Sequence, residues 1–357
     1  MKRNVLAILC AVLALSACSK NQPEQGISRK FIAHRGVDLN HTIAGENSLK
    51  AVELAKAAGF DAVETDVRYS KDGVLMVMHD ENLNRTCLNS DGSEITEPTP
   101  IRDKTLEELK NNYILKADAA ERRTRIPTLK EYLEHCKSVG MFVFIEPKLN
   151  DASGKYYQEI IDLADSIFGR NGYVVTSNNY ANNVIRNTLN IKDVRLMGIL
   201  YQTTYEAIQE LGNTIFAISA TRFEDPEYQA NVAKAKADGY LTESTADKFV
   251  TMDMVNRSGV DWVSTDMLIP DYKGQGTQIQ RNENHEVAFG GIWLELEFSG
   301  SATVQLANQK FSIESESGQT RRIRHQVALY NMKPVYKISN KSDDFKIVHE
   351  SVKVAEF

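Results

Sequence analysis

Residues 31–69 decide the fold, with FIAHRG at 31–36, SLKAVELAKAA at 48–58 and FDAVETDVRY at 60–69. The outer two segments are short and rich in apolar, aromatic and β-branched side chains, which is typical of buried strands. The middle segment has the length of an ordinary helix and begins at Ser48, a residue type that caps helix N-termini. A strand, a helix and a second strand in this order predict neighbouring parallel strands.

The same strand–helix alternation recurs along the chain and predicts the architecture. Eight such units within about 240 residues favour a closed (β/α)8 barrel over an open sheet. A doubly wound sheet is the alternative, but it usually carries a glycine-rich loop after its first strand, and HRGV at 34–37 is not one. The predicted strands are 31–36, 60–69, 141–148, 173–177, 195–201, 214–220, 240–243 and 262–266. The predicted helices are 48–58, 128–138, 156–168, 180–189, 204–211, 226–238 and 245–258.

Two segments depart from this alternation within and after a barrel domain predicted at 30–272. Residues 80–128 are expected to form an insertion on the catalytic rim, after an extra strand pair at 74–79 and with a helix near 105–111. The segment KGQG at 273–276 indicates a linker. Beyond it, residues 280–357 alternate apolar and polar side chains, which predicts a small antiparallel β domain.

The N-terminus is predicted to be a targeting signal. Residues 1–17 carry Lys2 and Arg3 followed by an apolar run at 5–15, which is too short for a transmembrane helix. The run ends in LSAC at 15–18, which resembles a bacterial lipoprotein signal with lipidation at Cys18, and 18–29 reads as a tether. A plain secretory signal is the alternative. We expect a lipid-anchored protein of the bacterial cell envelope, on its periplasmic or surface side.

Charge and cysteine content exclude several classes. The net charge of −6 disfavours a nucleic-acid binder, which needs a basic face. Apart from Cys10 and Cys18, only Cys87 and Cys136 remain, too few for a zinc cage or a disulfide scaffold. Whether these two pair with each other stays open.

Charged side chains gather where the predicted strands end. The clusters are His34 and Arg35, Glu64 and Asp66, His79 and Asp80, and Glu146 and Lys148. Each has an ordinary explanation by itself, such as a solvated strand face or a turn. In a barrel, however, all strand ends meet at one mouth. The expected oxygen donors for a hard cation are Glu64, Asp66 and Glu146. Arg35 and Lys148 suit a phosphate, and His34 and His79 can exchange protons, so together they indicate metal-assisted phosphodiester cleavage.

Several motifs carry a resemblance to a known family. They are FIAHRG at 31–36, GENSLKAVELAKAAGFDAVETDVRYSKDG at 45–73, MVMHDENLNRT at 76–86, IPTL at 126–129, FIEPK at 144–148, GVD at 259–261 and STD at 264–266. In this order and spacing, over residues 30–271, the sequence resembles the glycerophosphodiester phosphodiesterase family. The resemblance implies a barrel of the phospholipase C-like phosphodiesterase type with an insertion after its second strand.

The resemblance also implies a reaction and a residue set. The family hydrolyses glycerophosphodiesters to glycerol 3-phosphate and an alcohol with one divalent cation, Mg²⁺ or Ca²⁺. By position, the acid–base pair is His34 and His79, the metal ligands are Glu64, Asp66 and Glu146, the phosphate contacts are Arg35 and Lys148, and Glu46 joins the metal shell or a substrate hydroxyl. YLTES at 240–244 departs from the family's tryptophan-containing strand end and leaves the preferred alcohol open.

Two other functions remain alternatives. One is a phospholipase of the same barrel type acting on intact membrane lipid, and the other is a non-catalytic binding lipoprotein. The C-terminal domain is expected to bind a glycan, contact a protein or cover the barrel, with Trp293 in its core. The choice of metal, the order of the two histidines and the oligomeric state stay open.

Overall fold

The computed structural model describes residues 29–37, 43–198, 205–212, 215–218, 225–246, 252–266, 269–270, 276–282 and 284–357. The predicted signal peptide and Cys18 lie outside these residues, as does nearly all of the predicted tether.

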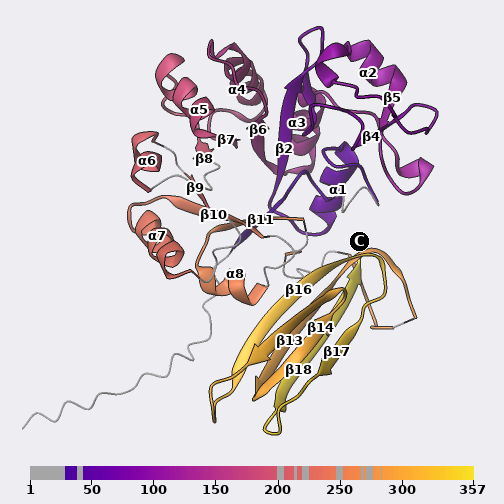
Figure 1. The fold of residues 1–357 in the computed structure, drawn as a ribbon, viewed down its shortest axis with the longest axis vertical. Coiled ribbons are helices and arrows are strands. Elements are labelled where there is room, and N and C mark those ends of the chain that lie inside the picture. The colour runs from indigo at the N-terminus through magenta and orange to yellow at the C-terminus, as the bar shows by residue number, and fades with distance from the viewer. Residues whose placement is uncertain are drawn as a thin grey trace, which may run out of the picture.

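A closed parallel barrel forms the first domain (Figure 1). Within the described residues, eight parallel strands follow one another around it in the order β1, β2, β6, β7, β8, β9, β10, β11, and β11 pairs back with β1. The strands are β1 (Lys30–Ala33), β2 (Ala62–Tyr69), β6 (Phe142–Pro147), β7 (Tyr173–Ser177), β8 (Leu196–Gly198), β9 (Ile215–Ile218), β10 (Leu241–Ala246) and β11 (Trp262–Thr265). The predicted barrel is therefore confirmed.

Alternation along each strand separates the barrel interior from the layer beneath the helices. Ile32, Phe144 and Trp262 fill the interior, whereas Val63 and Ile145 pack beneath the helices. The covering helices are α1 (Leu49–Ala57), α3 (Leu129–Val139), α4 (Lys155–Phe168), α5 (Asn179–Asn183) with the π-helical turn η3 (Val184–Thr188), α6 (Tyr205–Glu210), α7 (Pro226–Ala237) and α8 (Met252–Ser258).

One helix prediction is wrong at its start. Residues 245–246 continue β10, pairing with Ser264 and Thr265 of β11, and α8 begins at Met252. Thr245 is β-branched and lies in a ladder, so the strand pairing overrides the helical pattern read from the sequence.

The insertion has a small core of its own. It is preceded by β3 (Leu75–Val77), which pairs antiparallel with β2, and it contains a short pair, β4 (Cys87–Asn89) with β5 (Tyr113–Leu115). It also contains η1 (Ile101–Asp103), α2 (Leu106–Asn112) and η2 (Ala120–Arg122). Where the sequence predicted a strand pair at 74–79, the structure has the single strand β3, paired with β2. The predicted helix near 105–111 is α2, and the β4–β5 pair was not predicted.

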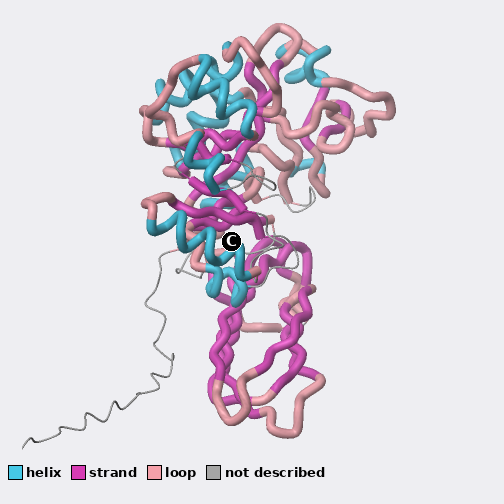
Figure 2. Tube along the Cα trace, turned by 60° about the vertical axis from the view of Figure 1, so that its left-hand side comes forward, coloured by secondary structure: helices cyan, strands magenta, loops and turns pink. Residues whose placement is uncertain are grey.

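The C-terminal domain consists, among the described residues, of two antiparallel sheets, as Figures 1 and 2 show. One sheet has the order β12 (Thr277–Ile279), β18 (Lys346–Glu356), β13 (Val287–Ser299), β16 (Arg321–Met332). The other has the order β15 (Gln309–Glu314), β14 (Ser301–Leu306), β17 (Tyr336–Ser339). Phe298, Val304 and Leu329 lie in the apolar cluster of this domain.

Two points that the sequence analysis raised, the pairing of the cysteines and the place of Trp293, find an outcome here. Cys87 and Cys136 are buried free thiols, so they do not form a disulfide. Trp293 is buried, as expected, but it lies in the apolar cluster of the barrel helices and not in the separate cluster of the β domain. None of the helices that the structure describes is both long and apolar enough to cross a membrane.

Candidate active site

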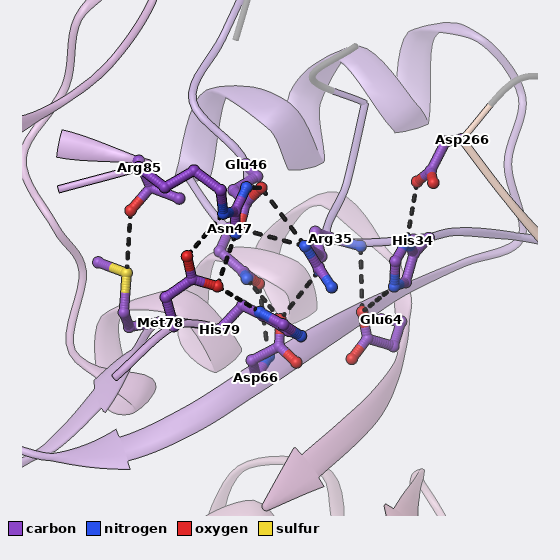
Figure 3. Close-up of polar contacts among 12 residues, drawn as sticks. His34, Arg35, Glu46, Asn47, Glu64, Asp66, Met78, His79, Arg85 and Asp266 are labelled. Atoms are coloured by element: carbon purple, nitrogen blue, oxygen red, sulfur yellow. Dashed lines mark hydrogen bonds and ion pairs between the residues drawn. The ribbon is translucent and has the colours of Figure 1, made fainter. Parts of the chain in front are cut away.

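The first strand delivers two candidate residues to the mouth of the barrel. Directly after β1 the chain turns, and His34 and Arg35 lie beside the acids of β2 (Figure 3). Arg35 has a left-handed backbone with φ of 56°, and its carbonyl accepts a 2.8 Å hydrogen bond from the Asn47 amide. Gly36 has φ of 76°, and a Cβ there would lie 2.7 Å from the Cβ of Ala51. Only glycine allows this close contact between the turn and α1.

The predicted oxygen donors come together from two neighbouring strands. Glu64 and Asp66 are alternate residues of β2 and share its inward face. Glu146 lies directly opposite Asp66 in the parallel β2–β6 register. One carboxylate oxygen from each residue lies within 4.8 Å of the others, a spacing compatible with shared ligation of one ion.

The electrostatics of this triad suit a cation. Burial and repulsion from Asp66 and Glu146 raise the pKa of Glu64 to about 8. Burial opposes ionisation of Asp66 too, but the charges of Lys148 and Arg35 lower its pKa below the ordinary value. Glu64 Oε1 is buried and has no hydrogen-bond partner within the described part of the chain. A divalent ion would satisfy this oxygen and relieve the repulsion.

The two predicted phosphate contacts flank the triad. Arg35 Nε lies 3.4 Å from Asp66 Oδ2, and Lys148 Nζ lies 2.9 Å from Asp66 Oδ1 and also contacts Glu146. Burial works against both positive charges, but the surrounding carboxylates raise the pKa of both side chains above the ordinary values. Both cations therefore stay charged at the mouth, where an anion can reach them.

Each predicted catalytic histidine has a carboxylate partner at Nδ1. His34 Nδ1 lies 2.8 Å from Asp266 Oδ1, and its Nε2 lies 3.9 Å from Glu64 Oε2. Burial disfavours the imidazolium, but Asp266 outweighs it and raises the pKa of His34 to about 9. His79 Nδ1 lies 2.6 Å from Asp80 Oδ1. A carboxylate at Nδ1 fixes the ring and leaves Nε2 for proton exchange.

Arg85 is a residue of this site that the sequence analysis did not single out (Figure 3). Its Nη1 and Nη2 donate to the two oxygens of Glu46 at 2.7 and 2.8 Å. Its Nε and Nη2 donate to Asp80 at 2.6 and 2.9 Å. Glu46, predicted at the mouth, is buried under Arg85, lies 3.4 Å from Arg35 and does not belong to the triad.

Asn47 and Asp266 are also positioned by the fold rather than by a visible spacing. Asn47 has φ of 60° and donates from Nδ2 to Asp66 Oδ2 at 2.7 Å. Asp266 follows β11, which pairs with β1, so it reaches His34 from the neighbouring strand. The STD motif contained Asp266, but without the pairing of β11 and β1 nothing linked it to His34.

An eight-stranded β/α barrel with carboxylates, cations and imidazoles at its mouth defines an enzyme of the phosphodiesterase class. A family model described as the glycerophosphoryl diester phosphodiesterase family matches residues 34–269. The chain therefore belongs to the glycerophosphoryl diester phosphodiesterase family.

Relatives of known name agree with this family. A glycerophosphodiester phosphodiesterase from Caldanaerobacter subterraneus subsp. tengcongensis is 31% identical over 246 residues, which cover 66% of this chain and 93% of that protein. A glycerophosphodiester phosphodiesterase from Bacillus altitudinis is 41% identical over 106 residues, which cover 29% of this chain and 39% of that protein.

Solved structures share the fold. A glycerophosphodiester phosphodiesterase from Agrobacterium tumefaciens matches with a TM-score of 0.54 at 23% identity, covering 67% of this chain and 96% of that one. An Oleispira antarctica phosphodiesterase, solved in complex with the product sn-glycerol-3-phosphate, matches with a TM-score of 0.54 at 24% identity, covering 66% of this chain and 92% of that one. At these identities the likeness supports the barrel itself.

Proposed function

We propose that this chain hydrolyses glycerophosphodiesters to sn-glycerol 3-phosphate and an alcohol, with one divalent cation, Mg²⁺ or Ca²⁺. The observation that carries the proposal is the group of three carboxylate oxygens within 4.8 Å, flanked by two cations. Membership of the family and the product found in the Oleispira structure support the same substrate class.

The residues present fit a divalent ion. Glu64, Asp66 and Glu146 would hold it, because they supply hard oxygen donors and one of those oxygens is buried without a partner among the described residues. An ion bound there supplies Lewis-acid stabilisation of the negative charge on the phosphate oxygens.

Arg35 and Lys148 bind and orient the phosphate. Both are held beside the triad by carboxylates, so they are fixed before substrate arrives. Their attraction to the phosphate oxygens grows as charge accumulates in the transition state. Arg35 also donates its backbone amide to Glu64 Oε2 at 3.1 Å, which ties the phosphate contact to the ligand set.

His34 and His79 carry the protons. One histidine accepts a proton from the attacking oxygen, which is water or a neighbouring substrate hydroxyl, as the new bond to phosphorus forms. The other donates a proton to the alcohol oxygen as its bond to phosphorus breaks. Asp266 and Asp80 orient the two rings through Nδ1.

The test is release of glycerol 3-phosphate from glycerophosphocholine. We expect His34→Ala and His79→Ala each to lower kcat about 10²–10⁴-fold, as loss of proton transfer does. Chelation should abolish turnover, and added Mg²⁺ or Ca²⁺ should restore it. Near-normal turnover in either variant removes that histidine from the reaction, and full activity in excess chelator removes the metal.

The same assay separates the two rival functions. A phospholipase would release product faster from the intact parent lipid than from glycerophosphocholine. A pure binding protein would retain glycerophosphocholine without turnover. Neither accounts as directly for two carboxylate-paired histidines beside a triad of acids.

We also propose that the protein is tethered to a membrane of the bacterial cell envelope by lipid on Cys18. Support comes from the LSAC sequence at 15–18 and from acyl chains being worth about 0.8 kcal/mol per buried CH₂. Metabolic labelling with a palmitate analogue tests it: the chain should incorporate label, and Cys18→Ser should not.

A further inference from the structure

We propose that the C-terminal β domain acts as a brace: it packs against the barrel and holds the loops of the catalytic mouth in position. Trp293, Gly291 and His325 are its positioning residues. The domain lies outside the matched family segment of 34–269. The inference rests on the proposed function, because its consequence is the alignment of His34 by Asp266.

The first attachment joins the domain to the loop behind Asp266. Trp293 Nε1 donates a 2.8 Å hydrogen bond to the carbonyl of Pro270, and both groups are buried. Pro270 lies four positions after Asp266 in the chain. Ile269, beside Pro270, shares one buried apolar cluster with Trp293 and with Val263 of β11, the strand that Asp266 follows. Trp293 therefore bears on the carboxylate that orients His34.

Close packing reinforces this attachment. Gly291 lies against Ile269, and a Cβ at Gly291 would lie 2.0 Å from Ile269 Cδ1 and 2.5 Å from the Trp293 ring. Ile269 is 1% exposed and Trp293 is 8% exposed, so neither side chain has solvent into which it can withdraw. A side chain at residue 291 would therefore collide with the ends of these two buried side chains, one from the barrel chain segment and one from the β domain.

The second attachment fixes the start of α8. The backbone amide of Met252, the first residue of α8, donates to His325 Nδ1 at 3.0 Å. His325 is buried on β16 and its Nε2 lies 2.7 Å from Gln309 Oε1. The imidazole supplies an acceptor to a helix N-terminal amide that has no partner within its own helix. This end of α8 follows β10 on the mouth side of the barrel.

The third attachment reaches the insertion. Asn331, at the end of β16, donates from Nδ2 to Asp118 Oδ2 at 2.9 Å. The insertion follows β2, whereas α8 and Pro270 follow β10 and β11, and β1 lies between these two groups of strands. The β domain therefore contacts the barrel on both sides of the turn that carries His34 and Arg35. Figure 1 shows β16 of the domain beside α8 of the barrel.

One apolar cluster spans the junction. Phe289, Trp293 and Tyr330 of the β domain share the core cluster of the barrel helices, whereas the far half of the domain has a separate cluster. The near end of the domain thus belongs to the barrel core. Substitutions at the two ends should differ in their effect on catalysis.

The experiment compares two glycine substitutions in the full chain. Gly291→Ala should lower kcat for glycerophosphocholine about tenfold or more with KM within about twofold, because misplacing a catalytic group acts on the transition state. Gly300→Ala is the matched control at the far end, where a Cβ would lie 2.7 Å from Ser342 Oγ and 2.8 Å from Phe345 Cα. It should reduce thermal stability and leave kcat unchanged.

A compensating change tests the contact itself. Ile269→Val removes the Cδ1 atom nearest the new methyl group, so Gly291→Ala with Ile269→Val should recover kcat to within about threefold of the parent. Trp293→Phe keeps an aromatic ring but removes the donor to Pro270, and it should lower kcat in the same way. If Gly291→Ala does not fold, Trp293→Phe alone tests the proposal.

Hydrogen–deuterium exchange supplies a readout that is independent of activity. Gly291→Ala and Trp293→Phe should both accelerate exchange at residues 262–266, and Gly300→Ala should not. Unchanged kcat in folded Gly291→Ala and Trp293→Phe, or an equal loss in Gly300→Ala, would overturn the brace. If the parent protein shows no turnover, the proposed function fails. In that case hydrogen–deuterium exchange alone tests the brace, and equal exchange rates at residues 262–266 in the parent and the variants would exclude the brace.

Discussion

Arg85 offers the sharpest test of how the mouth is organised. Its guanidinium donates two hydrogen bonds to Glu46 and two to Asp80, at distances between 2.6 and 2.9 Å. Asp80 in turn contacts Nδ1 of His79. Arg85→Met removes the guanidinium, leaving Glu46, among the residues that the structure describes, with the longer contacts to Arg35 at 3.4 and 3.5 Å.

The expected loss of stability depends on how deeply each partner of the Arg85–Glu46 ion pair is buried. The Glu46 side chain is 6% exposed, and breaking a buried pair typically costs about 3–5 kcal/mol. The Arg85 side chain is 44% exposed, so solvent screening reduces that cost. We therefore expect Arg85→Met to lower the free energy of unfolding by about 2 kcal/mol. Without Arg85, Asp80 should hold the His79 ring less firmly. We expect kcat to fall about 10–100-fold, less than the full loss of proton transfer would cause.

Urea denaturation measures the stability, and release of glycerol 3-phosphate measures the rate. Arg85→Lys should recover little, because an ammonium cannot reproduce the paired donors of the planar guanidinium. Arg102→Met is the control, since Arg102 meets Glu81 at 3.3 Å with 71% of its side chain exposed and should change stability by less than about 0.5 kcal/mol. Wild-type kcat in folded Arg85→Met, or the same loss in Arg102→Met, would refute the reasoning.

Three further predictions concern buried groups. Burial lowers the pKa of His325 from 6.5 to about 3, so as the pH falls the unfolded chain is protonated before the folded one. The neutral imidazole therefore contributes fully to the free energy of unfolding above pH 6.5, and this contribution declines as the pH falls toward 3. His325→Gln should make stability against urea less dependent on pH between about pH 7 and 5. Burial raises the pKa of Glu243 from 4.5 to about 8, so the contribution of its protonated carboxyl to the free energy of unfolding is complete below pH 4.5 and declines as the pH rises to 8. Glu243→Gln should therefore resist urea better than the parent at about pH 8, with no such gain at about pH 4. Burial raises the pKa of the Cys87 and Cys136 thiols, so neither should react with a thiol reagent until the chain unfolds, and rapid labelling of folded protein would contradict this.

Local patterns in the sequence were sufficient to predict the barrel. A short apolar strand or a capped helix can be recognised from its own residues, because the pattern of buried side chains and the capping residue lie close together in the sequence. β7 begins and ends where it was predicted, and α3 begins one residue after its capping Thr128. The alternation across residues 280–357 did not reveal where its strands turn: residues 303–313 belong to two strands, β14 and β15, joined through Ala307 with φ of 52°.

The alternation of a strand also predicted part of the site. Glu64 and Asp66 share a face because successive residues of a strand point in opposite directions. The charged clusters at the predicted strand ends also identified His34, His79 and Glu146, the resemblance assigned them family roles, and the structure brings Glu146 opposite Asp66. These residues were identified because each lies within a short motif.

What the sequence by itself determined, then, was the order of strands and helices and the identity of the charged residues at the strand ends. Only the tertiary structure decided their partners: Asp266 reaches His34 across 232 positions, and Arg85 reaches Glu46 across 39. The attachment of the β domain through Trp293 and His325 was equally invisible. The physical reason is that barrel closure and loop paths, rather than spacing along the chain, decide which distant side chains come within hydrogen-bonding distance.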